Sequence, residues 1–322
     1  ASDVYKRQMY YYSENEAYDE LREDFIDEFQ DQLQERDRGE ELKLIAEGTP
    51  FEAIMLKGGG ELVCPSIPME LVYLNCYVAG NNELDEAVTQ ILGIFDEDDW
   101  IPREQFEQIE HVLIYPMNLA EYEDKLVEGN IAYMPYQDMA VTFQFCIERG
   151  ERSYCGDVTK EHLEKWGIGV EELFEKVRYK DANEIGVGIV NMYDSLTNRY
   201  ENDKTILFRP ADGVPLELKQ VYNVYGVNGF GAIFYPKVME LVYDKLGDEM
   251  LIVPNDAFGA YVHAQSVGNL SDLYESLTSE NIMKEETGEI RHKLSERVFK
   301  YDLESRNLIH AVPPKIEKQK LR

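Results

Sequence analysis

The segment from Gly231 to Val262 constrains the fold more than any other part of the chain. The apolar run Ala232–Tyr235 predicts a buried strand, and Pro236 suits the first turn of a helix. Four apolar residues then recur at helical spacing: Val238, Leu241, Val242 and Leu246. Two more strands are expected after this helix, at Glu249–Val253 and Ala260–Ala264. The segment therefore predicts a hydrophobic core built from strands and one helix.

The rest of the chain mixes helical and strand patterns, which predicts an α+β fold with a mixed, partly antiparallel sheet and helices packed on it. Three glycines, Gly80, Gly167 and Gly268, each precede a helix with acid in its first turn. They indicate repeated strand-strand-helix units, although capped helices in general share this pattern. Helices are expected at 14–38, 69–79, 83–95, 119–127, 160–166, 170–179, 183–200 and 270–283, and strands at 42–46, 51–56, 111–115, 139–147, 153–157, 297–301 and 308–311.

Domain boundaries follow from composition. Residues 202–218 contain a loop-rich stretch that we interpret as a linker between an N-terminal region, 9–201, and a C-terminal region, 219–312. The tail 313–322 is expected to be disordered. Asp3–Gln8 matches the in-frame translation of a transposon-end sequencing adaptor, so we interpret Ala1–Gln8 as an artefact and Met9 as an uncertain start.

Charge limits the classes of partner. The 322 residues include 63 Asp and Glu against 32 Lys and Arg, a net charge of −31. This charge repels phosphate backbones and anionic lipid, so nucleic-acid and membrane binding are disfavoured. No apolar run approaches the ~18 residues that a membrane helix needs, and a cytoplasmic protein is expected. An alternative is an acidic surface that imitates nucleic acid and binds a basic partner, although the acid is spread along the chain.

The four cysteines are too scattered for a disulfide scaffold, and none forms a Cys-x-x-Cys zinc pair. Cys146 and Cys155 flank the turn at Gly150-Glu151. In a hairpin with a two-residue loop they lie opposite each other at a non-hydrogen-bonded position, close enough to be joined. Two reduced thiols are the expected state in a reducing compartment.

Residues that could carry chemistry are few. The chain has no nucleophile elbow, phosphate loop or metal-binding histidine pair, so no cofactor and no metal is expected. His162 lies four residues before Trp166, a spacing that predicts ring packing and a Trp166 that anchors its helix. The candidates for proton transfer are Asp256 and His263, beside the turn that follows Pro254.

Several stretches together resemble the uncharacterised bacterial family called domain of unknown function 5688, over about Phe25 to His310. They are Cys64-Pro-Ser-Ile-Pro-Met-Glu-Leu, Glu83-Leu-Asp-Glu-Ala-Val, Leu163-Glu-Lys-Trp-Gly-Ile, Glu172-Leu, Gly231-Ala with Tyr235-Pro, Leu251-Ile-Val-Pro, and Leu294-Ser-Glu-Arg-Val-Phe-Lys-Tyr-Asp. The family carries no assigned activity, so the resemblance implies no catalytic residue.

Departures from the family pattern fall on polar positions. Where the family tends to read Pro-Ser-Ser-Ile-His-Glu, this chain has Phe258 and Gly259 at the last two positions. Where it tends to read Ile-Asn-Tyr-Glu, only Asn118 is kept. We therefore expect a non-enzymatic binding or accessory protein that acts through protein contacts. The alternative is an enzyme with a polar cleft near Pro254–Asp256 and His263.

Overall fold

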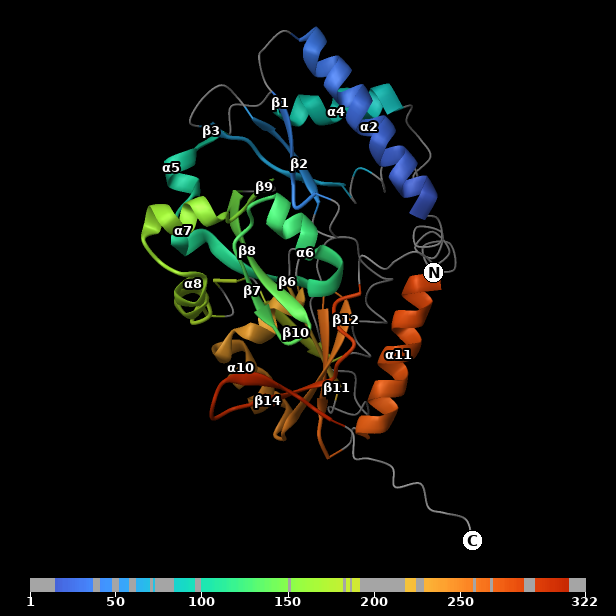
Figure 1. The fold of residues 1–322 in the computed structure, drawn as a ribbon, viewed down its shortest axis with the longest axis vertical. Helices are drawn as coiled ribbons and strands as arrows, with labels where there is room; N and C mark the ends of the chain where they lie inside the picture. Colours follow the sequence, from blue (N-terminus) through green and yellow to red (C-terminus); the bar gives the residue numbers. More distant parts are fainter. Residues whose placement is uncertain are drawn as a thin grey trace. The chain divides into compact units, whose positions relative to one another are not determined.

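The computed structural model describes residues 15–36, 41–47, 52–57, 62–69, 72, 84–95, 100–149, 152–181, 184–185, 187–191, 218–223, 229–256, 259–266, 269–286 and 293–312. The chain divides into two compact units, 1–179 with 283–293 (unit 1) and 180–282 with 294–322 (unit 2). This boundary precedes the linker expected at 202–218. That linker, the N-terminal eight residues and the tail 313–322 lie outside the described residues. The expected α+β class is confirmed (Figure 1).

In the part of unit 1 that the structure describes, the strands form three antiparallel groups. β1, β2 and β4 form one sheet, β3 pairs with β5, and β8 pairs with β6 along one edge and with β7 and β9 along the other. The strands are β1 (Glu41–Ile45), β2 (Ala53–Lys57), β3 (Leu62–Val63), β4 (Ile67–Pro68), β5 (Ile101–Pro102), β6 (Val112–Asn118), β7 (Tyr133–Tyr136), β8 (Met139–Arg149) and β9 (Arg152–Asp157). The helices are α2 (Asn15–Glu35), α4 (Leu84–Phe95), α5 (Arg103–Phe106), η2 (Ile109–His111, 3-10), α6 (Leu119–Glu128), α7 (Lys160–Trp166) and α8 (Val170–Val177).

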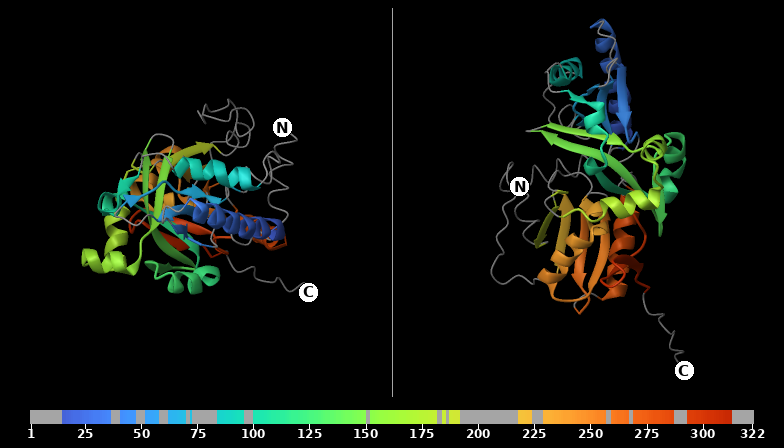
Figure 2. Two further views of the ribbon diagram at one scale, coloured as in Figure 1. Left: turned by 90° about the horizontal axis from the view of Figure 1, so that it is seen from above. Right: turned by 90° about the vertical axis from the view of Figure 1, so that its left-hand side faces the viewer.

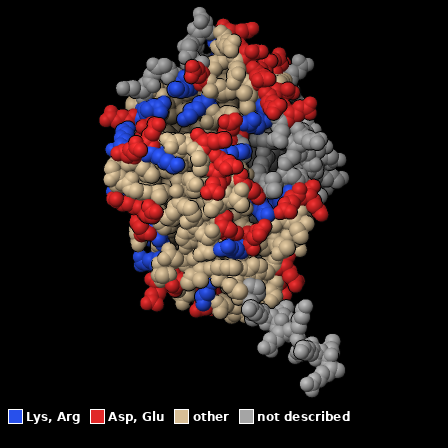
Figure 3. All heavy atoms as spheres, in the orientation of Figure 1, with Lys and Arg blue, Asp and Glu red and all other residues tan. Residues whose placement is uncertain are grey.

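The long helix α2 forms because its apolar residues recur on one face. Phe25 and Phe29 are fully buried, and the ring of Phe29 lies 6.1 Å from that of Phe95 in α4, which runs beside it (Figure 1). Its other face carries acid, and acidic side chains gather over α2 in Figure 3, whereas acidic and basic side chains are interspersed elsewhere on that face. The acid of α2 is therefore the solvent side of an amphipathic helix.

Unit 2 is built on a six-stranded antiparallel sheet in the order β10-β11-β13-β12-β14-β15. The right-hand view of Figure 2 shows it from β10 (yellow) at one edge to β14 and β15 (red) at the other. The 3-10 helix η3 packs on β11 and β13, and Leu277 of α11 packs on Val253 and Val298. The elements are β10 (Val187–Asn191), β11 (Leu218–Asn223), η3 (Gly229–Phe234), α10 (Pro236–Leu246), β12 (Met250–Asp256), β13 (Gly259–Ala264), α11 (Leu270–Glu286), β14 (Phe299–Asp302) and β15 (Asn307–His310).

Two expected elements in unit 2 are wrong. The buried run expected as a strand at Ala232–Tyr235 is mostly the 3-10 helix η3, because a short run buried on all sides has no periodicity that separates strand from helix. The helix expected at 183–200 is replaced, where it is described, by the strand β10, which pairs with β11. The helix after Pro236 is confirmed, although Leu241 points to solvent with 44% of its surface exposed. None of the described helices combines the length and apolarity needed to cross a bilayer.

Candidate functional site

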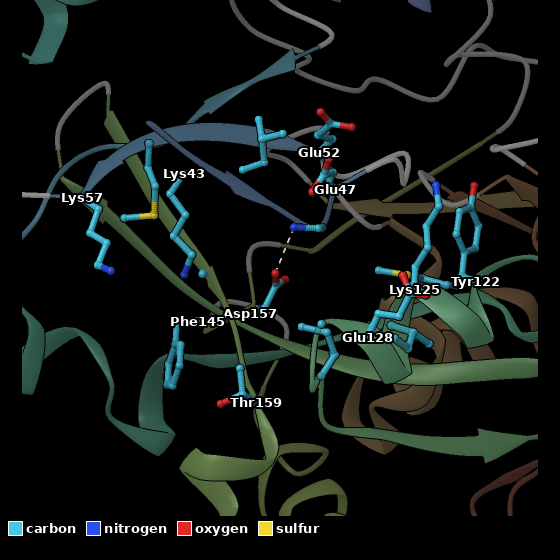
Figure 4. A pocket seen from close by; sticks show the side chains of 18 of the residues that line it. Lys43, Glu47, Glu52, Lys57, Tyr122, Lys125, Glu128, Phe145, Asp157 and Thr159 are labelled. Carbon is cyan, nitrogen blue, oxygen red and sulfur yellow. Dashed lines mark hydrogen bonds between the residues drawn. The ribbon is translucent and has the colours of Figure 1, made fainter. Parts of the chain in front are cut away.

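A pocket of about 1120 Å³ lies within unit 1. Its walls come from the β1–β2 hairpin, from β9, and from α5 and α6 (Figure 4). Apolar and charged side chains share the lining, and the apolar ones include Met55, Val63, Phe106, Met117 and Phe145. The pocket is therefore a recess with a partly apolar wall and several charged groups around it.

Asp157, at the end of β9, joins two walls of this pocket. Its Oδ2 accepts a hydrogen bond from the backbone N–H of Ala46 at 2.9 Å, dashed in Figure 4, and its Oδ1 accepts one from Gln144 Nε2 at 3.0 Å. Ala46 has a left-handed backbone (φ 48°), a conformation that costs a non-glycine residue about 1–2 kcal/mol. Burial raises the pKa of the Asp157 carboxyl, although these two hydrogen bonds and the charge of Lys43 act in the opposite direction. Asp157 thus holds the end of β1 against β9.

Glu107, just after α5, is the centre of a second charged cluster. Arg103 Nη1 lies 3.1 Å and His162 Nε2 3.4 Å from its Oε1, and Lys165 Nζ lies 3.4 Å from its Oε2. Burial alone would raise the pKa of Glu107, but the hydrogen bonds and charges of His162 and Arg103 outweigh it and lower that pKa to about 2. The cluster therefore stabilises the fold above pH 4.5 and loses that contribution as the pH falls toward 2.

His162 is oriented by the start of its own helix. The backbone N–H of Thr159 donates to His162 Nδ1 at 2.9 Å, so the imidazole takes the place of the Glu or Gln of a capping box. Because Nδ1 accepts that hydrogen, the ring carries a proton on Nε2, which faces Glu107. The histidine is thus held at both nitrogens.

Four aromatic rings pack beside this cluster. Phe145 lies 5.3 Å from Phe106, 5.0 Å from His162 and 5.9 Å from Trp166, measured between ring centroids. The expected packing of His162 on Trp166 is confirmed at 5.9 Å. These rings fix α7 against β8, and three of them, Phe106, Phe145 and His162, line the pocket.

Gly156 makes room for one of these rings. A Cβ at this position would lie 3.0 Å and 3.2 Å from two ring carbons of Phe106. We expect Gly156→Ala to lower the free energy of unfolding by about 1–3 kcal/mol. Denaturation followed by tryptophan fluorescence measures this in unit 1, because both tryptophans, Trp100 and Trp166, belong to it.

Two further variants check the reason for that loss. Phe106→Leu combined with Gly156→Ala should cost less than the sum of the two single changes. Gly93→Ala in α4, where a Cβ would meet no atom within 4 Å, should stabilise unit 1 by about 0.5–1 kcal/mol. Equal losses at Gly93 and Gly156 would contradict the steric explanation.

A third charged group lies where α2 meets the hairpin. Arg22 Nε lies 2.7 Å from Glu52 Oε1, and its Nη2 lies 3.4 Å from Glu47 Oε1. The Glu52 side chain is buried, so this pair ties α2 to β2. Like Glu107 and Asp157, these side chains have structural partners within the protein.

The residues predicted for proton transfer are in unit 2 and are not brought together. Asp256 pairs with Gly259 at the end of the β12–β13 hairpin, whereas His263 pairs with Leu251. Gly259, the partner of Asp256, lies four residues along β13 from His263, a separation of about 13 Å between Cα atoms. Asp256 and His263 are therefore too far apart for a direct hydrogen bond. The Asp256 side chain is outside the description. Burial lowers the pKa of His263 to about 4, so this imidazole is neutral at pH 7.

Within the described ranges, the structure has no group of three or more His, Cys, Asp and Glu side chains placed to share a metal ion. Asn118, the polar residue kept from the Ile-Asn-Tyr-Glu pattern, has a structural role. Its Oδ1 accepts the N–H of Glu121 at 3.3 Å and caps α6.

A comparison with protein-family models matches residues 18–256 to a family described as "Family of unknown function (DUF5688)". The chain belongs to this family. The DUF5688 match includes every residue that lines the pocket and ends at Asp256, before His263. No curated protein and no solved structure matches the chain.

Proposed function

We propose that this DUF5688 protein is a non-enzymatic binding protein and that the pocket of unit 1 takes up an acidic, apolar segment of a protein partner. The observation that carries the proposal is the arrangement of the pocket's charges. Glu107, Arg22 and Asp157 each have partners within the protein that hold the fold together. Charged groups that are held by such partners form a rigid recess. They are poorly suited to catalysis, because a catalytic group must change partners during the reaction.

The size of the pocket supports a polypeptide ligand. Sites for small molecules are usually about 300–1,000 Å³, and the recess in unit 1 is about 1120 Å³. Several residues of a partner chain would fit, with their apolar side chains against Met55, Phe106 and Phe145. These three side chains are at most 5% exposed, so the apolar contribution to affinity would come mainly from burial of the partner's own side chains.

Two lysines indicate the charge of that segment. Lys43 of β1 pairs with Met55 of β2, and Lys57 lies two residues further along β2, so all three share one face of the hairpin. In Figure 4 the side chains of Lys43 and Lys57 extend from the hairpin toward Phe145. Among the described residues, neither lysine has a carboxylate within ion-pair distance, although the charge of Lys43 also acts on Asp157. A partner carboxylate placed between them would meet two cations beside an apolar wall.

A displayed library of random dodecapeptides tests this proposal. Selection on the wild-type protein should enrich sequences that combine Asp or Glu with large apolar residues. The variant Lys43→Glu/Lys57→Glu should bind these peptides at least ~10-fold more weakly. The control Lys237→Glu/Lys245→Glu makes the same charge change on exposed positions of α10 and should bind as the wild type does. No enrichment, enrichment of basic peptides, or equal losses in both variants would overturn the proposal.

The proposal includes a bacterial cytoplasmic location, because the four cysteines are too scattered for the disulfide scaffold of a secreted protein. It includes no nucleic-acid partner, because the net charge of −31 opposes phosphate backbones. The enzyme alternative at Asp256 and His263 is weakened by the hairpin register, which separates the two residues.

A further inference from the structure

We propose that Cys146 and Cys155 form a reversible redox site, in which a low-molecular-weight disulfide oxidises the two thiols to a cross-strand disulfide. The expected hairpin is confirmed, since Cys146 of β8 is the register partner of Cys155 of β9. Both side chains are half-buried. The inference does not depend on the proposed function.

The backbone places the two thiols at a position that a disulfide can span. The N–H of Cys155 donates to Ser66 Oγ at 3.0 Å, away from β8, so the cysteines face each other at a non-hydrogen-bonded position. Cα atoms in such a pair lie about 4.5 Å apart, within the ~4.4–6.8 Å range of disulfides. Closing the bond therefore requires little movement of the backbone.

The reaction is two thiol–disulfide exchanges. One cysteine thiolate attacks the small disulfide, forms a mixed disulfide and releases one small thiolate. The second cysteine thiolate attacks the mixed disulfide at the protein sulfur, forms the Cys146–Cys155 bond and releases the second thiolate. Two electrons pass from the protein to the small disulfide, and the two protons leave with the released thiols.

A disulfide between Cys146 and Cys155 would affect the pocket, because the two cysteines lie beside one of its walls. Gln144 of β8 pairs with Asp157 of β9, two residues along each strand from the cysteine pair. Every second residue of a strand is on the same face, so the two pairs share one face of the hairpin. Asp157 in turn holds Ala46 at the end of β1. A disulfide would tie β9 to β8 beside this contact and would make the pocket wall more rigid.

Cys64 is an internal comparison. It is fully buried, and its Sγ hydrogen-bonds to the carbonyl oxygen of Leu56 at 3.1 Å. A small disulfide should therefore react at Cys146 and Cys155 and leave Cys64 reduced.

The test uses the folded full chain, oxidised glutathione, an acid quench, alkylation and trypsin. Trypsin cuts after Arg149 and Arg152, between the two cysteines, so the bond appears as a linked peptide pair in the mass spectrum. We expect this pair to form with an equilibrium constant at least ~100-fold larger than in denaturant, where the chain no longer aligns the thiols. Cys146→Ser and Cys155→Ser should each accumulate the glutathione mixed disulfide on the remaining cysteine.

Three results would overturn the inference: a wild-type protein that accumulates mixed disulfide without closing the bond, a linked pair that contains Cys64 or Cys76, or equal equilibrium constants with and without denaturant. The comparison with denaturant uses only the wild type, so it holds even if a serine variant fails to fold.

Discussion

Replacing Phe145 with alanine is expected to lower the free energy of unfolding of unit 1 by about 3–5 kcal/mol. Phe145 is 1% exposed, and its ring contacts Phe106, His162 and Trp166. Truncation removes the apolar area and leaves a cavity whose walls, strand β8 and helix α7, are fixed by their own hydrogen bonds. Chemical denaturation followed by tryptophan fluorescence measures the loss in unit 1.

Phe145→Leu is the matched control, because it keeps most of the apolar volume. It should cost less than half as much as Phe145→Ala. A loss below about 1 kcal/mol for the alanine variant would mean that the ring cluster does not hold α7 against β8. The pocket would then lack the rigid wall on which the proposed function depends.

The second large effect is a pH dependence of the stability of unit 2, which arises from His263. Its pKa is lowered by burial from 6.5 to about 4, so between these values the unfolded chain binds a proton that the folded chain does not. Stability due to the neutral ring is therefore complete above pH 6.5 and is lost as the pH falls toward 4. Because the ring is half-buried, the expected loss is about 2–3 kcal/mol.

Hydrogen exchange of the amides in β12 and β13 at several pH values measures this effect. His263→Gln removes the titration and should flatten the dependence between pH 6.5 and 4, while the corresponding curve for unit 1 stays unchanged. If wild type and variant lost protection in parallel, the imidazole would be solvated in the folded protein.

The sequence predicts those elements whose local pattern and tertiary environment agree. Helix α2 has one apolar face that packs and one acidic face that does not, and the β8–β9 hairpin has a tight turn between two apolar strands. The prediction fails at η3, where the surroundings bury every side, and at β10, which is a strand because β11 pairs with it. In both places the deciding contacts come from outside the segment.

The candidate site was harder to predict, because its parts lie far apart in the chain. Glu107 and His162 meet only because α5 and α7 both pack on Phe145 of β8, and Asp157 meets Ala46 across the interface of two sheets. One local signal is the spacing of Thr159 and His162, which is that of a capping box, but the residue at the N3 position of that motif is usually Glu or Gln. Closeness in sequence suggests the Asp256–His263 pair, but the register of a single hairpin separates the two residues.

The most direct test of the binding site is a methyl NMR titration with the strongest acidic, apolar peptide from the library. Met55 and Met117 line the pocket, whereas Met239 and Met250 are buried in unit 2. The peptide should shift the methyl signals of Met55 and Met117 and leave those of Met239 and Met250 in place. Shifts confined to the methionines of unit 2 would contradict a binding site in unit 1.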